Sequence, residues 1–235
     1  VAFADKCWPA FPSQFGFEPC YVNSRLVSRG IPVACEVDIY GALSEYIGMC
    51  ASDDTVTLLD INNSVPQYIY DEDIVGKYDY KLTDTFMGFH CGNTPQCKMC
   101  STRAIKYQLI PTRPLENGGN PDFTRGTLEG DIAASDITFY RLQCDSEGNL
   151  RSYIAEGEVL DVPTRSFGGI GIFAIPEMGR FYRHVLIQKG YPHHGAVAFS
   201  HVGKTLFEAF KFLGIKDIAY NQPASLPYPT ENPWK

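Results

Sequence analysis

The sequence predicts an α/β segment followed by a mainly antiparallel β-barrel. Between Ile31 and Asp60, a short apolar run, an amphipathic stretch and a second apolar run follow one another, which is typical of a strand, a helix and a strand. From residue 105 onward, short runs of apolar and β-branched residues alternate with glycine-rich turns, and helical periodicity returns only near the C-terminus. The first pattern indicates parallel β-strands, and the second indicates a β-barrel or a sandwich.

The first segment places two acids where strands are expected to end. The predicted strands are 31–35 and 55–59, and they are joined by a helix over 39–49. Glu36 and Asp60 directly follow these strands, so a parallel βαβ unit would bring both acids to one edge of the sheet. Ligands bind at this edge in open parallel sheets, and two carboxylates there can hold a hard divalent cation or share acid and base chemistry. Acids that are solvated or that cap the next helix are the alternative at these positions.

Turn residues and periodicity predict the remaining elements. A short helix is expected from about Tyr21 to Ser28, with Gly30 as its stop. Residues 64–82 combine tyrosines with acids and indicate irregular or edge structure. The later runs that are expected to form strands are 107–115, 125–132, 135–145, 150–163 and 169–176.

The C-terminal part returns to helical patterns. A short helix over 180–188 and a strand over 195–199 precede an amphipathic helix over 203–213. Four prolines in the last residues predict an extended tail. We therefore expect three parts: 1–66 as the end of a central α/β domain with the two acids, 67–222 as a C-terminal β-barrel domain with its closing helix, and 223–235 as the tail.

Composition excludes some classes of partner. The chain has 235 residues, of which 44% are apolar and 20% charged, so we expect a globular protein. A formal charge of −7 without a Lys/Arg cluster argues against nucleic acid. No apolar run approaches the roughly 20 residues of a spanning helix, so we expect no membrane attachment. Eight cysteines, several of them inside apolar runs, predict a reduced, cytoplasmic protein.

A second group of potential metal ligands lies between residues 82 and 101. It contains His90, Cys91, Cys97 and Cys100. The Cys97-x-x-Cys100 pair suggests zinc, but a structural zinc site needs a second pair with similar spacing, and His90 and Cys91 are adjacent. A glycine-rich turn with buried or loop thiols is the favoured interpretation, and a structural zinc module stays an alternative.

Several motifs in a fixed order resemble one enzyme family. ACEVDIYGALS, LLDIN and PHHGAVAFSHVG, the last followed by an amphipathic helix, are similar to the C-terminal half of the L-fucose isomerase family and, more distantly, to L-arabinose isomerase. RGTLEGDIAASDITFYRL and PTRSFGGIGIF resemble the β-barrel domain that closes those enzymes. The resemblance implies the C-terminal half of a fucose/arabinose isomerase-like fold, and it implies that the chain, which begins at Val1, is a fragment without the N-terminal domain.

The resemblance also implies a metal site and a sugar site. In that family a glutamate, an aspartate and a histidine bind one divalent metal, usually Mn²⁺, and the matching positions are Glu36, Asp60 and His194. His90 matches a further metal ligand or substrate contact of the arabinose enzymes. His193 stands where the fucose enzymes have asparagine and resembles the arabinose pattern instead, and it is a further substrate-binding candidate. Two aromatic residues, Trp8 and Phe167, are candidates for the apolar face of the sugar or for the core.

The implied activity is the isomerisation of an aldose to its ketose through an enediol. Mn²⁺ would stabilise the charge that forms on the sugar oxygens, and Glu36 and Asp60 would act as base and acid. The expected substrate is a deoxyhexose or a pentose, and the resemblance implies a homo-oligomer with its active site near a subunit interface. A non-catalytic sugar-binding or regulatory module on the same scaffold is the main alternative.

Overall fold

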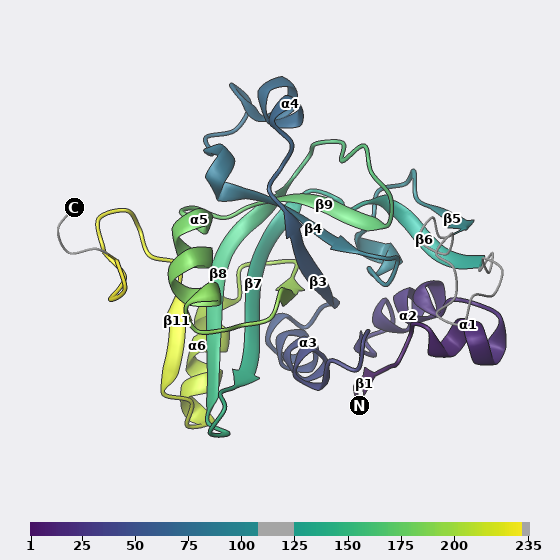
Figure 1. Cartoon of the computed structure of the whole chain (residues 1–235), viewed down its shortest axis with the longest axis horizontal. Helices are drawn as coiled ribbons and strands as arrows, with labels where there is room; N and C mark the ends of the chain where they lie inside the picture. Colours follow the sequence, from purple (N-terminus) through teal and green to yellow (C-terminus); the bar gives the residue numbers. More distant parts are fainter. Residues whose placement is uncertain (108–124, 232–235) are drawn as a thin grey trace.

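A nine-stranded sheet forms the centre of the computed structural model, which describes residues 1–107 and 125–231 (Figure 1). The strand order is β11-β8-β7-β10-β3-β4-β9-β6-β5. The strands are β3 (Val56–Asn63), β4 (Thr85–His90), β5 (Ala104–Tyr107), β6 (Arg125–Asp131), β7 (Ser135–Cys144), β8 (Leu150–Leu160), β9 (Gly169–Ala174), β10 (His194–Ala198) and β11 (Asp217–Tyr220). Of the pairs that the described strands form in this sheet, β11–β8 and β6–β9 are parallel and the others antiparallel.

One additional pairing changes the shape of this sheet. β8 pairs with β7 along its length and also with β9, where Leu160 lies opposite Ile172. The pairings therefore run through β8, β7, β10, β3, β4 and β9 and return to β8. The protein is a mixed α/β structure with one large, mostly antiparallel sheet. This confirms the prediction of a mixed α/β protein with mainly antiparallel strands.

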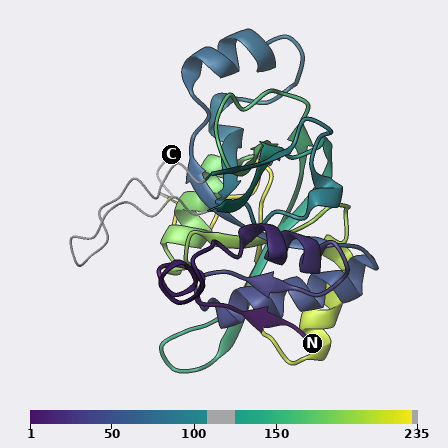
Figure 2. The ribbon, with the colours of Figure 1, turned by 90° about the vertical axis from the view of Figure 1, so that its right-hand side faces the viewer.

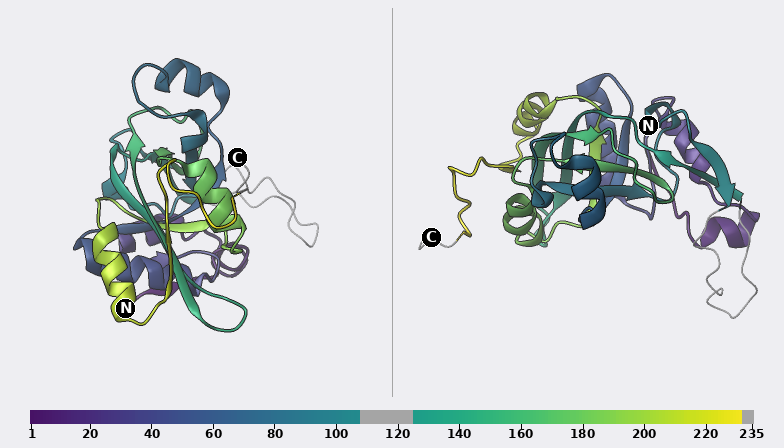
Figure 3. Two further views of the ribbon diagram at one scale, coloured as in Figure 1. Left: turned by 90° about the vertical axis from the view of Figure 1, so that its left-hand side faces the viewer. Right: turned by 90° about the horizontal axis from the view of Figure 1, so that it is seen from above.

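Helices and short helical turns surround the sheet. The α-helices are α1 (Ala10–Phe15), α2 (Cys20–Val27), α3 (Ile39–Ser52), α4 (Gln67–Ile69), α5 (Met178–Phe181) and α6 (Gly203–Phe212). The other helical turns are η1 (Tyr70–Ile74), η2 (Leu82–Asp84), η3 (Gln96–Lys98) and η5 (Tyr182–Ile187). The α4–η1 segment projects from the sheet (Figure 2), and α1 and α2 lie at the end of the molecule opposite the C-terminal tail (Figure 3).

The two faces of the sheet bury different clusters. Successive side chains of a strand point to opposite faces, so Leu58 packs with α3 and α6 while Leu59 joins the cluster that includes Phe181 of α5. The same alternation separates Tyr140 from Phe139 on β7. The sheet is thus covered on one face by α3 and α6 and on the other by α5 and η5.

The predicted parallel βαβ unit is wrong. The first apolar run forms only a two-residue strand, β2 (Val33–Ala34), which pairs in parallel with β1 (Phe3–Ala4) in a separate sheet. β3 is antiparallel to both of its neighbours, β10 and β4. Periodicity identified the strands and the helix between them, but it cannot identify the partner of a strand, and here the partners of β3 come from later in the chain.

Most of the other elements lie near their predicted positions. β6 to β9, β10, α2 and α6 occupy the expected runs, and α5 with η5 covers the predicted helix over 180–188. β4 was missed because all six of its residues are buried, so that no alternation of polar and apolar residues marks it as a strand. Short helical turns replace the irregular structure predicted for 64–82. Residues 108–115 of one predicted strand and 232–235 of the tail lie outside the described residues.

The described part of the tail packs against the molecule. The ring of Tyr228 is buried and stacks on His184 of η5 at 5.8 Å between centroids. Arg180 of α5 donates two hydrogen bonds to Glu231, of 2.8 and 2.7 Å. These contacts join the described part of the tail to α5 and η5, and its extended character stays a prediction.

The expected domain boundary near residue 66 stays a prediction. β3, which precedes it, is hydrogen bonded to β4 and β10, which follow it. In the described ranges, no helix combines the length and the apolar character that crossing a membrane requires.

A fully buried acid on α3 predicts a pH effect on stability. Burial raises the pKa of Glu45 well above its usual range, so the folded chain keeps this carboxyl protonated while the unfolded chain ionises it above about pH 4.5. The free energy of unfolding therefore falls as pH rises. We expect Glu45→Gln to be more stable than the parent at pH 8, by a margin that shrinks toward pH 4. Urea denaturation at several pH values checks this, with the exposed Glu147→Gln as control; a margin independent of pH would contradict it.

Candidate active site

His194 lies at the centre of the candidate site, at the start of β10. It is directly opposite Asp60 in the antiparallel β3–β10 pair. Residues opposite each other in such a pair extend their side chains on the same face, only about 5 Å apart at Cβ. As a result, Nε2 of His194 lies 3.0 Å from Oδ1 of Asp60.

Glu36 reaches the same nitrogen through an unusual turn. Glu36 and Val37 follow β2 with φ angles of 63° and 59°, in the left-handed region that non-glycine residues rarely adopt. The amide of Val37 donates to the carbonyl of Asp5 at 2.8 Å and fixes the turn. Oε2 of Glu36 lies 3.4 Å from Nε2 of His194. The turn and the strand register thus bring Glu36, Asp60 and His194 together, by a topology other than the expected one.

The other ring nitrogen of His194 is held by Asp38, which the sequence analysis missed. Nδ1 of His194 lies 2.8 Å from Oδ2 of Asp38. Arg141 of β7 donates to both carboxylate oxygens of Asp38, at 2.6 and 2.8 Å, and Gly41 donates a third hydrogen bond at 2.8 Å. In the absence of a metal, the raised pKa of His194 keeps a proton on both ring nitrogens. A bound cation would displace the proton from Nε2, while Nδ1–H continues to donate to Asp38.

A sequence signal for Asp38 existed. It directly precedes α3 and caps the N-terminus of this helix. Helix capping was the alternative role for Glu36 and Asp60, and in the structure Asp38 has that role. Arg141 had no such signal, because it lies 103 positions along the chain from its partner.

Charges in the site favour ionised carboxylates. Burial alone would raise the pKa of Asp38, but hydrogen bonds from His194 and Arg141 hold it well below its usual range. The nearby imidazole of His194 lowers the pKa of Glu36, and on Asp60 the same histidine helps to outweigh burial, so that the pKa of Asp60 is lowered too. Burial would lower the pKa of His194, but Asp38, Asp60 and Glu36 together raise it to about 11. The site thus concentrates negative charge around one imidazole.

The donor set fits a divalent cation. Oδ1 of Asp60 and Nε2 of His194 are buried and face each other at 3.0 Å, and neither makes a well-aligned hydrogen bond with a described residue. Two carboxylates and an imidazole are ligands that Mn²⁺ accepts, and none of the three is a thiol. One ligand atom each of Asp60, His193 and His194 lies within 4.8 Å of the others, and Glu36, which is not in that group, approaches it through Nε2 of His194 at 3.4 Å. These residues are therefore able to hold a metal ion.

His193 and His90 lie beside this set. Nε2 of His193 is 3.6 Å from Oδ1 of Asp60, and its side chain is 60% exposed, so it faces solvent at the rim. His90 ends β4 and is buried, with its ring centroid 6.4 Å from that of His194. Its Nδ1 accepts a hydrogen bond from the amide of Cys91, and its Nε2 has no partner in the part of the chain that the structure describes. An unpartnered ring nitrogen so near the site is available to a ligand.

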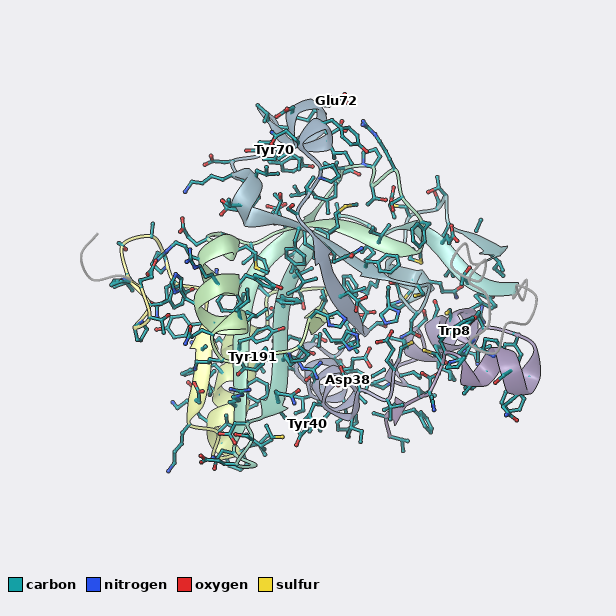
Figure 4. All side chains as sticks on the ribbon, viewed as in Figure 1. Trp8, Asp38, Tyr40, Tyr70, Glu72 and Tyr191 are labelled. Atoms are coloured by element: carbon teal, nitrogen blue, oxygen red, sulfur yellow. The ribbon has the colours of Figure 1, made fainter. Side chains whose placement is uncertain are left out.

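The two aromatic candidates, Phe167 and Trp8, make no described contact with the site residues. Phe167 packs edge-on against Phe89 at 5.4 Å between centroids and is a partly buried residue at the side of a core cluster, which favours its interpretation as core. Trp8 is half-buried in the turn between β1 and α1 (Figure 4). Among the described residues, no hydrogen bond or ring contact joins either side chain to Glu36, Asp60 or His194.

The zinc alternative lacks the necessary geometry. Cys97 is exposed, and it contacts Thr55 at 3.8 Å between Sγ and Oγ1. Within the ranges that the structure covers, His90, Cys91, Cys97 and Cys100 do not form a metal-ligand cluster. All eight cysteines are free thiols.

Comparison with known proteins points to one family. A family described as "L-fucose isomerase, C-terminal domain" matches residues 88–220, a range that contains His90, His193 and His194. A sulfoquinovose isomerase of Alkalicoccus urumqiensis is 26% identical over 208 residues, which are 88% of this chain and 41% of that protein. A sulfoquinovose isomerase of Priestia aryabhattai is 25% identical over 93% of this chain and 44% of its own length.

A third relative, the sulfoquinovose isomerase of Clostridium sp. (strain MSTE9), is 28% identical over 177 residues, covering 75% of this chain and 34% of its own length. The chain thus spans less than half the length of these curated relatives.

Proposed function

The chain belongs to the L-fucose isomerase family, and from this premise we propose that it carries the metal-binding and acid–base site of a sugar isomerase. The observation that supports this most strongly is the approach of Glu36 and Asp60 to the same nitrogen of His194, at 3.4 and 3.0 Å. Three potential ligands from segments far apart in the chain meet there. Two of the atoms involved, Oδ1 of Asp60 and Nε2 of His194, are buried and make no well-aligned hydrogen bond with a described residue. A cation bound between these atoms would satisfy both of them.

The proposed reaction moves a proton between neighbouring carbons of an aldose to give the ketose. A bound divalent cation, for which Mn²⁺ is our proposal, would supply Lewis-acid stabilisation of negative charge on the sugar oxygens. The protein contributes two carboxylates whose pKa values are lowered, so both are ionised at neutral pH and able to accept a proton. We assign base and acid to this pair without dividing the roles between them.

The two carboxylates differ in how firmly the structure holds them. The side chain of Asp60 is 23% exposed and is carried by the central strand β3, whereas that of Glu36 is 55% exposed and is carried by the left-handed turn. Asp60 is therefore the fixed group, and Glu36 is the group that can adjust to a bound sugar. His90 and His193 are our candidates for contacts with sugar hydroxyls, because the first has a buried nitrogen that no described residue satisfies and the second faces solvent at the rim.

The substrate is proposed at the level of a class. The names of the curated relatives make sulfoquinovose the first sugar to test, and the motifs shared with the fucose and arabinose enzymes add L-fucose and L-arabinose. On the same resemblance we propose that the complete protein is a cytoplasmic homo-oligomer with its active site near a subunit interface.

Activity of the full-length protein tests the proposal. The protein is stripped with EDTA, incubated with each of the three sugars with and without Mn²⁺, and followed by ¹H NMR for the ketose and for exchange of the proton at C2 with D₂O. We expect conversion of at least one sugar that requires added metal. Absence of conversion and of exchange for every sugar would contradict the assignment. Saturable sugar binding that ignores EDTA would instead support the non-catalytic sugar-binding module.

A further inference from the structure

A second cluster of potential ligands lies at the end of the small β1–β2 sheet. The two strands are parallel, with Ala4 opposite Ala34, so Asp5 and Cys35 leave the sheet side by side. Cys7 lies two residues beyond Asp5. One ligand atom of each of Asp5, Cys7 and Cys35 lies within 4.8 Å of the others. None of its three members is Glu36, Asp60 or His194.

The cluster is built into the interior. Cys7 is 9% exposed and Cys35 is 1% exposed. Oδ1 of Asp5 is buried and has no hydrogen-bond partner within the described ranges. An unpartnered carboxylate oxygen beside two buried thiols is costly unless another group satisfies it.

A neighbouring amide orients the carboxylate. Asn23, itself buried on α2, donates through Nδ2 to Oδ2 of Asp5 at 2.8 Å, and the same nitrogen lies 3.9 Å from Sγ of Cys35. This contact occupies one oxygen of Asp5 and leaves the other available. An outer-shell partner of this kind fixes the orientation of a ligating carboxylate in metal sites.

The chemistry of the three groups selects the ion. Thiolates bind Zn²⁺ at about 2.3 Å and carboxylates at about 2.0–2.2 Å, so the ligand atoms of a tetrahedral site lie about 3.4–3.8 Å apart. Ligand atoms that lie within 4.8 Å of one another reach these separations when each moves inward by less than about 1 Å. Two sulfur ligands favour a thiophilic ion over Mn²⁺, Mg²⁺ or Ca²⁺, which prefer oxygen.

We propose that Asp5, Cys7 and Cys35 form a second metal site, which takes a thiophilic divalent cation of the Zn²⁺ type and leaves a fourth position for water. Binding displaces one proton from each thiol, because the thiolate is the ligand. The site directly precedes Glu36 in the chain, and the amide of Val37 is bonded to the carbonyl of Asp5. A bound ion therefore stabilises the left-handed turn that presents Glu36 to His194.

Cadmium titration of the whole chain tests this second site. Cd²⁺ prefers sulfur ligands, and its thiolate complexes absorb in the ultraviolet, whereas a site of carboxylates and imidazole gives no such band. With the protein reduced and stripped of metal, we expect the band to grow to one equivalent of Cd²⁺. Zn²⁺ should remove the band by competition, and Mn²⁺ should not.

Variants separate this site from the other ligands. Cys7→Ser and Cys35→Ser should each abolish the one-equivalent band, while Cys97→Ser, at an exposed thiol, and His194→Gln should keep it. Asp5→Asn should keep the band and lower the Cd²⁺ affinity by at least ~10-fold, and Asn23→Ala by about 10–100-fold, as outer-shell losses do. Circular dichroism verifies that each variant folds.

The proposal is overturned by a folded, reduced parent chain without a thiolate band, or by a band that survives unchanged in both cysteine variants. If the two serine variants fail to fold, an unchanged Cd²⁺ affinity in Asp5→Asn overturns it. The sugar-isomerase proposal rests on Glu36, Asp60 and His194, so the two proposals can fail independently. Mn²⁺-dependent activity can be absent while the cadmium band is present, and the band can be absent while the activity is present.

Discussion

Replacing Asp60 by asparagine is expected to lower kcat/KM of the full-length protein for its sugar by at least about 100-fold, since the loss of a group that transfers protons typically costs 10²–10⁴-fold. The carboxylate lies 3.0 Å from Nε2 of His194, and its Oδ1 is buried without a hydrogen-bond partner among the described residues. Asparagine has nearly the same shape but no negative charge, so it removes both a proton acceptor and an anionic metal ligand. Mn²⁺ affinity should therefore fall together with activity.

Calorimetric titration with Mn²⁺ and the isomerase assay are the two measurements for Asp60→Asn. Asp217→Asn is the matched control, because Asp217 lies on the edge strand β11 and pairs with Lys189 at the surface. We expect parent-like Mn²⁺ affinity and activity in that control. A folded Asp60→Asn protein with unchanged Mn²⁺ affinity would contradict the assignment of Asp60 as a ligand.

Replacing Asp38 by asparagine is expected to cause a large loss of stability and of metal affinity together. Asp38 forms two hydrogen bonds with Arg141, whose side chain is only 3% exposed, so the substitution leaves a buried guanidinium without this counter-charge. Breaking such a pair costs roughly 3–5 kcal/mol. The substitution also replaces the carboxylate that faces Nδ1 of His194 by a neutral amide, and loss of an outer-shell partner lowers metal affinity by about 10–100-fold.

A double variant separates the two effects of Asp38. In Asp38→Asn/Arg141→Met the buried guanidinium is removed as well, so the free energy of unfolding should recover much of the loss seen in Asp38→Asn. Metal affinity should not recover, because His194 still lacks the carboxylate that orients it. Urea denaturation and Mn²⁺ calorimetry on the single and double variants measure the two quantities. If Mn²⁺ affinity returned along with stability, Asp38 would have only a structural role.

The sequence indicated which residues meet at the site, but it did not indicate how they meet. Glu36 and Asp60 were expected to meet at the edge of a parallel sheet, but the contact depends on the antiparallel register of β3 with β10 and on a left-handed turn after β2. Both depend on contacts between segments remote in sequence. Local periodicity reports which residues are apolar, and it does not report strand partners or backbone angles of single residues.

The supporting residues show a different limit of sequence analysis. Asp38 was visible only as an acid before a helix, and its second role depends on His194, which lies 156 positions away. Arg141 lies in the middle of a buried strand, where its neighbours indicate only a β-strand. β4 escaped detection for a related reason, since both of its faces are buried. A residue that acts through a partner can be recognised only when the position of that partner in the folded chain is known.

The most direct test of the central claim is the location of bound Mn²⁺ in the protein, by anomalous diffraction at the manganese absorption edge from crystals saturated with the ion. We predict one strong peak in contact with the carboxylates of Glu36 and Asp60 and with Nε2 of His194, and its loss in Asp60→Asn crystals. A folded, Mn²⁺-saturated protein without a peak at these three residues would contradict the claim that they form the metal centre of a sugar isomerase.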